Sequence, residues 1–408
     1  MRIAFAGTAA TLEVPNSLKF EAALKAAAPD WPFAASQDHR DPLAIVTEEA
    51  GGFSLAVRDS DPIHTTAVSA ACGAMVALAD FWADERPDRL CFHSGAALFG
   101  GRLVVFPNRY RAGKSTLIAR LAAMGLTIFG DDILPVSADD NTGVALGLAP
   151  RLRIPLPATA SRTFRNFVED HSAASDGRYC YLRLGVGLLA PRDAAAPLGA
   201  VVLLERVEQG RPELRPASKS AALQALIERN FARAAPSGAL LDRLYRLMDR
   251  LPRFTLRYSN FEDAAELLAM TFASWPPHIP ATDEPSEVMS RQVSPDVDAT
   301  VPFSPSFPPE TPMIRSASVK LYEVEDDVFL ATPDGLSIHK LNATGAGLWN
   351  LLAESISQHQ SIDVLCDAFP DADRRAVADD VSRLFSALSR AGFIVQACSA
   401  RERDPRGR

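Results

Sequence analysis

The fold is decided by the stretch Arg111-Ala112-Gly113-Lys114-Ser115-Thr116-Leu117. It follows the apolar run Leu103-Val104-Val105-Phe106 after a short loop. An apolar strand, a loop and a helical stretch from Thr116 to Met124 follow one another in the order that a phosphate-binding P-loop requires. In such a loop, backbone N–H groups at the helix start face phosphate oxygens, the lysine reaches the β and γ phosphates, and the next hydroxyl contacts Mg²⁺. The pattern therefore predicts a site for a nucleotide triphosphate, with ATP and Mg²⁺ as its ligands.

The loop departs from the pattern G-x-x-x-x-G-K-[ST] at one position, because Asn108 stands where the first glycine is usual. Asn tolerates left-handed backbone angles better than other residues with a side chain, so the turn remains possible. We expect the loop residues as a group to contact the nucleotide. They are Asn108, Arg109, Arg111, Ala112, Gly113, Lys114, Ser115 and Thr116.

Paired carboxylates follow the loop at the distance that one helix and a return turn cover. Ile128-Phe129-Gly130 reads as a short strand, and Asp131 and Asp132 come directly after it. One carboxylate can hold Mg²⁺ while its neighbour accepts a proton from an attacking hydroxyl, which is the division of labour in phosphoryl transfer. A solvated Asp-Asp turn is the alternative interpretation, and the preceding loop favours the functional one.

A further apolar stretch, Leu90 to Leu98, is predicted to be a strand and contains one histidine, His93. Taken alone, a single histidine in such a strand is more often a core residue than a catalytic one. Together with the loop and the carboxylates, however, the residues from Leu90 to Val136 resemble the kinase domain of the HPr kinase/phosphorylase family. The matching features are His93-Ser94-Gly95, a hairpin, G-K-S-T, a helix ending in Gly125, and Gly130-Asp131-Asp132.

This resemblance implies a role for each matching residue. Lys114 and Ser115 are expected to bind nucleotide phosphates and Mg²⁺, with Asp132 as a second metal ligand. Asp131, Asp132 and His93 form the implied catalytic set; which aspartate is the general base stays open, and we favour Asp131. The family's later glycine-rich signature is not found, so the resemblance favours a kinase of something other than HPr.

The C-terminal part has a different pattern. Short strands are predicted over 319–324, 328–331 and 336–341, followed by a helix that Asn342 caps. Further helices are predicted over 361–369 and 373–390, before Gly392 and Phe393-Ile394-Val395.

This segment resembles a PqqD domain, a small α+β, winged-helix-like module that also serves as the recognition element for leader peptides in ribosomal peptide modification. The residues that carry the resemblance are Leu341-Asn342, Thr344-Gly345, Trp349 and the final Leu384, Leu388 and Gly392-Phe393-Ile394. In such domains a leader peptide adds as a strand to the sheet edge and packs on the last helix. The implied peptide-binding residues are Leu336, Ile338, Lys340, Ala378, Val381 and Phe385, while Trp349 is expected in the core.

Five segments follow from these patterns. Residues 1–88 are an N-terminal α/β module without an assigned role, and 89–274 are the P-loop kinase domain, a mixed sheet with flanking helices. Residues 275–315 are rich in proline and polar residues and are predicted to be a flexible linker. Residues 316–397 are the PqqD-like domain, and 398–408 are a charged tail.

Composition limits location and partners. The net charge of -8 and the lack of a clustered basic stretch argue against nucleic acid as the main ligand. The five cysteines are scattered without a C-x-x-C pair, which indicates reduced thiols in a cytoplasmic protein. The start is too short an apolar run for a signal peptide, and we expect no membrane span.

The combined hypothesis is an ATP-dependent kinase that phosphorylates a Ser or Thr hydroxyl of a precursor peptide captured by the PqqD-like domain. Two alternatives stay open: a non-catalytic adaptor that delivers a precursor peptide, and a small-molecule kinase. Retention of Lys114, Ser115, Asp131 and Asp132 favours catalysis over the adaptor.

Overall fold

The structure is a computed structural model, and it describes residues 1–58, 60–107, 112–137, 140–231, 235–275, 308–332 and 338–397. The predicted site residues Asn108, Arg109, Arg111 and Leu336 and most of the predicted linker lie outside these ranges. The chain divides into two compact units, Met1–Ala235 with Arg243–Ala281, and Pro236–Asp242 with Thr282–Arg408. Helix α6 (Ser237–Arg250) spans the division.

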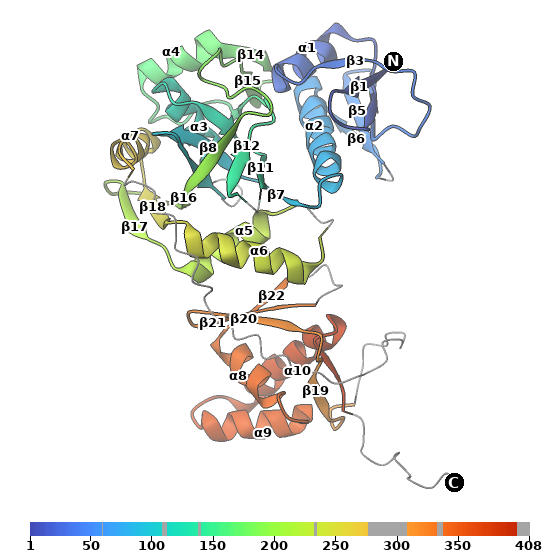
Figure 1. The fold of residues 1–408 in the computed structure, drawn as a ribbon, viewed down its shortest axis with the longest axis vertical. Helices are drawn as coiled ribbons and strands as arrows, with labels where there is room; N and C mark the ends of the chain where they lie inside the picture. The colour runs from blue at the N-terminus through green and yellow to red at the C-terminus, as the bar shows by residue number, and fades with distance from the viewer. Residues whose placement is uncertain are drawn as a thin grey trace. The chain divides into compact units, whose positions relative to one another are not determined.

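The first unit contains three sheets with helices beside them (Figure 1). Its strands are β1 (Arg2–Phe5), β2 (Thr11–Glu13), β3 (Phe33–Ala35), β4 (Ala44–Glu49), β5 (Gly52–Val57), β6 (Ile63–Thr65), β7 (Arg89–Phe92), β8 (Gly95–Phe99), β9 (Arg102–Phe106), β10 (Ile128–Gly130), β11 (Leu134–Ser137), β12 (Thr142–Val144), β13 (Arg151–Arg153), β14 (Ser172–Ser175), β15 (Tyr179–Leu182), β16 (Ala195–Arg206), β17 (Glu213–Pro216) and β18 (Arg253–Tyr258). Its helices are α1 (Leu18–Ala27), α2 (Ala67–Asp84), α3 (Lys114–Ala123), α4 (Arg162–His171), α5 (Lys219–Arg229) and α7 (Phe261–Thr271).

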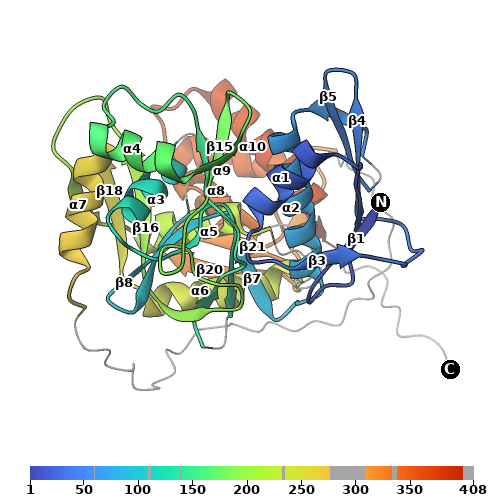
Figure 2. The same ribbon diagram turned by 90° about the horizontal axis from the view of Figure 1, so that it is seen from above.

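The N-terminal sheet has the order β3-β1-β2-β4-β5-β6, and α1 and α2 pack beside it (Figure 2). Helix α2 begins after Thr66, whose side chain accepts a hydrogen bond from the Ser69 N–H. A side-chain cap of this kind satisfies one of the free N–H groups of the first turn, and it sets the start of the helix at Ala67.

Helix α2 has, by length and composition, the properties of a membrane-crossing helix, with 18 residues and a mean hydropathy of 1.3. No such helix was expected from the sequence. In the structure 61% of its residues are buried inside the protein, where its many alanines allow close contact with α1 and β5. Its apolar composition is therefore explained by its burial in the core of the first unit.

The described strands of the central sheet form a nine-stranded mixed sheet with the order β10-β8-β9-β16-β12-β11-β7, and β18 pairs with both β16 and β17. Strands β9, β16 and β18 run parallel to one another. Their carboxyl ends therefore meet at one edge of the sheet, the edge where open α/β sheets bind ligands. The loop to α3 leaves from this edge.

The stretch Leu90 to Leu98, predicted to be one strand, belongs to two strands, β7 and β8, which His93 and Ser94 separate. This prediction is wrong because β7 and β8 take separate places in the sheet: β7 pairs with β11, whereas β8 pairs with β9 and β10. The His93 N–H is bonded to the carbonyl of Arg229, 2.7 Å away, instead of to a neighbouring strand. At Gly95 a Cβ would lie 2.8 Å from Ile118, so the start of β8 packs against α3.

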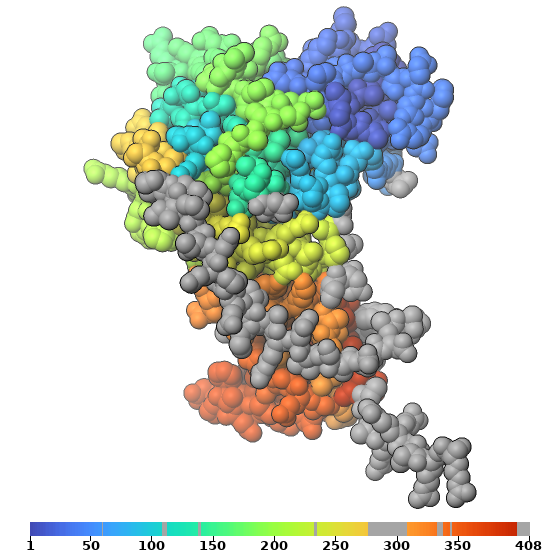
Figure 3. Space-filling model, viewed as in Figure 1, coloured from blue at the N-terminus to red at the C-terminus, as the bar shows by residue number. Residues whose placement is uncertain are grey.

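A small antiparallel sheet, β13-β15-β14, lies beside α1, α2 and α3. Its Tyr181, together with Cys91 and Ile133 of the central region, belongs to the same hydrophobic core as α1, α2 and the N-terminal sheet. The N-terminal and central segments also adjoin in the space-filling view (Figure 3). Residues 1–88 therefore share a core with the segment that follows them.

The second unit combines two small sheets with three helices among its described residues. Its elements are β19 (Met313–Arg315), β20 (Lys320–Val324), β21 (Asp327–Ala331), β22 (Ile338–Leu341), α8 (Ala343–Leu351), α9 (Gln358–Ala368), α10 (Arg374–Arg390) and β23 (Ile394–Gln396). The antiparallel order is β20-β21-β22, and β19 pairs with β23. Trp349 is 2% exposed in the core, as predicted.

Local hydrogen bonds set the helix starts of this unit. The Asn342 side chain accepts from the Gly345 N–H at 2.8 Å, so the predicted cap is confirmed. Helix α9 begins at Gln358, three residues before the predicted start, because Ser357 and Gln360 form a capping box. Strand β19 lies within the segment predicted to be linker, and its pairing with β23 explains its order.

Candidate active site

The described end of the turn between β9 and α3 is Ala112 and Gly113, directly before the first helical residue. Gly113 precedes the first helical residue with φ of +87°, where a side chain is strained, and an added Cβ would lie 2.8 Å from the Tyr258 hydroxyl. That hydroxyl donates to the carbonyl of Ala112 at 2.7 Å. Burial raises the pKa of Tyr258 to about 12, so this donor keeps its proton at physiological pH. Tyr258, at the end of β18, thus fixes the last turn of the loop.

Lys114 begins α3 and reaches the paired carboxylates at the end of β10. Its Nζ lies 2.8 Å from Asp132 Oδ1 and 3.9 Å from Asp131 Oδ1, and it donates to the carbonyl of Asp131. Lys114 is only 8% exposed. Residues 17 and 18 positions apart in the chain are therefore in direct contact, as the strand–loop–helix–strand reading requires.

The two carboxylates have opposite pKa shifts. Burial and the neighbouring Asp132 charge raise the pKa of Asp131 to about 6, against the opposing effects of Lys114, the Ser115 hydroxyl and the Arg151 N–H. Burial also acts to raise the pKa of Asp132, but the Lys114 ammonium and hydrogen bonds from His93 and Lys114 outweigh it and hold this pKa well below its usual range. Two carboxylates with pKa values pushed apart suit a base and a permanently charged partner.

His93 lies at the break between β7 and β8 and faces the same carboxylates. Its Nε2 is 3.3 Å from Asp132 Oδ1, and its side chain is 53% exposed. The histidine is therefore on the solvent side of the site and is no core residue, in contrast to the alternative that its apolar neighbours suggested.

The residues present fit a magnesium ion. Asp131 Oδ1 is buried and has no hydrogen-bond partner among the described residues, while Asp131 Oδ2 accepts from the Arg151 N–H at 3.2 Å. Ser115, half-buried at the start of α3, supplies a hydroxyl beside them. In the described part of the chain no group of three or more His, Cys, Asp or Glu side chains is arranged so that it alone could hold a metal ion. Two carboxylates and a hydroxyl suit Mg²⁺, which usually takes few protein ligands and completes its shell with water and phosphate oxygens.

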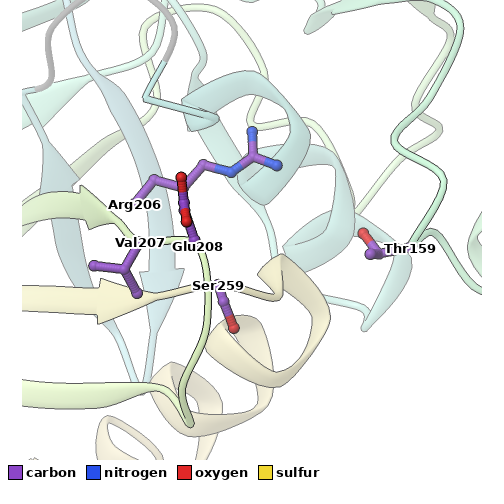
Figure 4. Close-up of a pocket in the computed structure, with 5 residues that line it drawn as sticks. All are labelled: Thr159, Arg206, Val207, Glu208 and Ser259. Atoms are coloured by element: carbon purple, nitrogen blue, oxygen red, sulfur yellow. The ribbon is translucent and has the colours of Figure 1, made fainter.

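An open hollow of about 610 Å³ lies at the carboxyl ends of β16 and β18. Arg206, Val207, Glu208 and Ser259 line one side, and Thr159 lies opposite (Figure 4). Because Ser259 directly follows Tyr258, the hollow and the phosphate-binding loop are linked through one strand end. No sequence pattern had indicated these residues.

Arg151 and Tyr258 are the site residues that the sequence analysis missed. Arg151 contributes a backbone N–H to Asp131, and Tyr258 contributes a hydroxyl to the loop. Neither belongs to a motif: they come from strands formed 20 and 146 residues away from their partners. The only sequence signal that could have indicated that these residues lie at a sheet edge is the alternation of apolar and polar residues in their strands.

The predicted peptide groove is placed in part. Strand β22, with Ile338 and Lys340, is at the edge of its sheet. Lys340 forms an ion pair with Asp327 at 2.7 Å. On α10, Val381 and Phe385 are 3% and 6% exposed and belong to the core of the second unit, and Ala378 is half-buried at its rim. Their part in peptide binding stays a prediction.

Comparison with known proteins separates the two units. Residues 327–394 match the family model of coenzyme PQQ synthesis protein D (PqqD). The C-terminal unit therefore carries a PqqD domain, in agreement with the sequence resemblance. No curated protein gives a significant match to the chain.

Two solved structures are similar to parts of the chain. The structure of TbiB1 in complex with the TbiA(beta) leader peptide is 23% identical, with a TM-score of 0.19, and the match covers 21% of this chain and 99% of that one. The structure of the Hpr(Ser) kinase/phosphatase from Coxiella burnetii is 11% identical, with a TM-score of 0.24, and the match covers 44% of this chain and 91% of that one. The predicted α/β fold class with mixed sheets is confirmed.

Proposed function

We propose that this protein is an ATP-dependent kinase that transfers the γ-phosphoryl group to a Ser or Thr hydroxyl of a precursor peptide, in the cytoplasm, during biosynthesis of a modified peptide. The observation that carries the proposal is the contact of Lys114 with both Asp131 and Asp132 at the edge where the parallel strands end. A P-loop lysine beside two carboxylates is the arrangement that phosphoryl transfer uses.

Each side chain has a task in this proposal. The N–H groups at the start of α3 and the Lys114 ammonium hold the nucleotide phosphates. Asp132 and Ser115 would hold Mg²⁺, which supplies neutralisation of phosphate charge when bound. Asp131, with its raised pKa, accepts the proton of the attacking hydroxyl, and His93 lies on the exposed side of Asp132.

The hollow lined by Arg206 and Ser259 is the proposed place of the nucleoside. It lies at the same sheet edge as the loop, and Tyr258 connects the two. Ligands of open α/β sheets occupy this edge.

The PqqD domain supports a peptide as acceptor. The similar TbiB1 structure contains a leader peptide, and among the described strands β22 is at the edge of its sheet, a position that a peptide strand can extend. Because the two units belong to one chain, a captured peptide would stay at raised local concentration for the kinase.

The test is phosphate transfer from radiolabelled ATP and Mg²⁺ to a precursor peptide by the purified full-length chain. Lys114→Ala and Asp131→Asn are expected to lower the rate by at least about 100-fold, since each removes a group that acts in the transition state. Labelling at the same rate in both variants would overturn the proposal.

A further inference from the structure

The N-terminal module, residues 1–88, packs against the small sheet that contacts the proposed catalytic base. Helix α2 contacts β15, the middle strand of the sheet β13-β15-β14, and α1 contacts β14 and β15. Tyr181 of β15 is 4% exposed and belongs to the hydrophobic core of α1, α2 and the N-terminal sheet. Cys72 of α2 packs against the same core. One side of the small sheet is therefore held by the N-terminal module.

The same sheet supplies a hydrogen bond to the proposed base. Arg151 begins β13 and is opposite Tyr181 in the pairing of β13 with β15, so the two side chains share one face. The Arg151 N–H donates to Asp131 Oδ2 at 3.2 Å. Its guanidinium stacks on the Tyr179 ring, with Cζ 4.3 Å from the ring centroid. Arg151 thus connects the buried face of the sheet to Asp131.

Electrostatic effects at Cys72 show that α2 lies close to this contact. Burial raises the pKa of the Cys72 thiol, the Arg151 guanidinium opposes this shift, and the Asp132 carboxylate adds to it. Asp132 also acts on Arg151 itself. A side chain of the N-terminal module is therefore within electrostatic reach of Arg151 and of the paired carboxylates.

A second contact joins the start of α2 to the turn between β14 and β15. The Thr66 hydroxyl, which caps α2, donates to Asp176 Oδ2. The Ser69 hydroxyl donates to the same oxygen at 3.4 Å. Asp176 Oδ1 accepts from the N–H groups of Arg178 and Tyr179, at 3.0 and 2.8 Å. Asp176 therefore links the first turn of α2 to the strand whose aromatic ring supports the guanidinium.

We propose that the N-terminal module is a positioning element for phosphoryl transfer: through Thr66 and Asp176 it holds the small sheet so that the Arg151 N–H keeps the proposed base in place. This inference rests on the proposed kinase function and gives residues 1–88 a part in it. The contact with Asp131 comes from a backbone group, so it depends on where the strand lies. A misplacement of about 1 Å can lower a rate roughly 100-fold.

The first experiment removes the bond between Thr66 and Asp176 and keeps the cap of α2. In Thr66→Asp the new carboxylate can still accept from the Ser69 N–H, but it repels Asp176 instead of donating to it. Thr66→Ser keeps both the cap and the donor. Phosphate transfer from ATP and Mg²⁺ to the precursor peptide is measured with the full-length chain. Thr66→Asp is expected to lower kcat about 10- to 100-fold with KM for ATP unchanged, whereas Thr66→Ser stays within about two-fold of the wild type.

Ser218→Asp is the matched control, because the Ser218 side chain caps α5 of the same unit in the same way. Asp176→Asn is a second variant that leaves α2 unaltered. Its Oδ1 can still accept from the turn, but the bond with Thr66 loses its charge, so kcat should fall in the same direction by a smaller factor. Equal kcat in the wild type and both test variants, or an equal loss in Ser218→Asp, overturns the inference while leaving the kinase proposal intact.

The second experiment does not depend on catalysis. Amide hydrogen exchange of the nucleotide-free, full-length chain is followed at single residues by mass spectrometry with electron-transfer fragmentation. Thr66→Asp is expected to speed exchange of the Arg151 N–H at least about ten-fold, while the amides within α3 exchange as in the wild type. This result in a chain that phosphorylates no peptide would support the link from the N-terminal module to Asp131 and would sink only the kinase proposal. Unchanged exchange at Arg151, or equal acceleration throughout α3, overturns the inference.

Discussion

Replacing Asp131 by Asn is expected to stabilise the nucleotide-free protein at neutral pH, although it removes the proposed base. The side chain is 3% exposed, and its pKa is raised from the ordinary value of 3.8 to about 6. The folded protein therefore holds this proton more tightly than the unfolded chain does. The uncharged Asn side chain avoids the cost of ionising a buried carboxylate.

The pH window follows from the sign of the shift. Below pH 3.8 the carboxyl is protonated in both states and costs nothing. As pH rises from 3.8 to 6 the unfolded chain releases the proton first, so the free energy of unfolding falls. Above pH 6 the full cost applies, about 3 kcal/mol for a shift of this size. That cost corresponds to a melting temperature roughly 6–12 °C higher in the variant, for a unit of this length.

The assay is differential scanning calorimetry of the full-length wild type and variant between pH 4 and pH 8, with a chelator and without nucleotide. The gap between the two melting temperatures should widen with pH and level off above pH 6. Asp41→Asn, at an exposed carboxylate, is the control and should show no such trend. A variant that melts at or below the wild-type temperature at pH 8, or a gap that does not change with pH, would refute the reasoning.

Three other changes test the site and the second unit. Lys114→Ala should abolish the rise in melting temperature that ATP and Mg²⁺ produce in the wild type. At a ligand concentration 100 times Kd, binding stabilises the folded protein by about 2.7 kcal/mol. No rise in the wild type itself would contradict a nucleotide site. Tyr258→Phe removes the donor to the Ala112 carbonyl, so it should lower the free energy of unfolding by about 1 to 2 kcal/mol. It should also weaken ATP binding in the same thermal assay. An unchanged stability and an unchanged ATP effect would show that the loop does not depend on this hydrogen bond. The fragment 308–397 should fold alone and bind a leader peptide. Ile338→Pro should impair this binding while the circular dichroism spectrum stays native, because proline removes a backbone donor from edge strand β22. Equal affinity of the variant and the unchanged fragment for the peptide would place the peptide elsewhere.

The site residues that could be predicted from the sequence are those that belong to short, contiguous motifs. Gly113, Lys114 and the aspartate pair belong to short patterns, and one helix between them fixes their meeting. The pattern around His93 was misleading, because apolar residues continue through a point where the chain changes strands. No residue near His93 indicates that the end of α5 and the residues after it lie beside β7 and His93.

The remaining site residues depend on sheet pairing. Tyr258 reaches the loop because β18 runs parallel to β16, and Arg151 reaches Asp131 because β13 packs beneath α3. Such pairings depend on long-range contacts that a single sequence does not mark. Strand β19 shows the same limit: three residues after a proline-rich segment form a strand only because β23, about 80 residues later, is present.

The pairing of β19 with β23 also brings the first and last strands of the second unit side by side. Met313 is opposite Gln396, so the segment 313–396 begins and ends at neighbouring points. A unit with adjacent ends can be inserted into, or attached to, another protein without threading or stretching its host. The proposed peptide-binding module is therefore suited to transfer: joined to a different modifying enzyme, it would need only one linker, at β19.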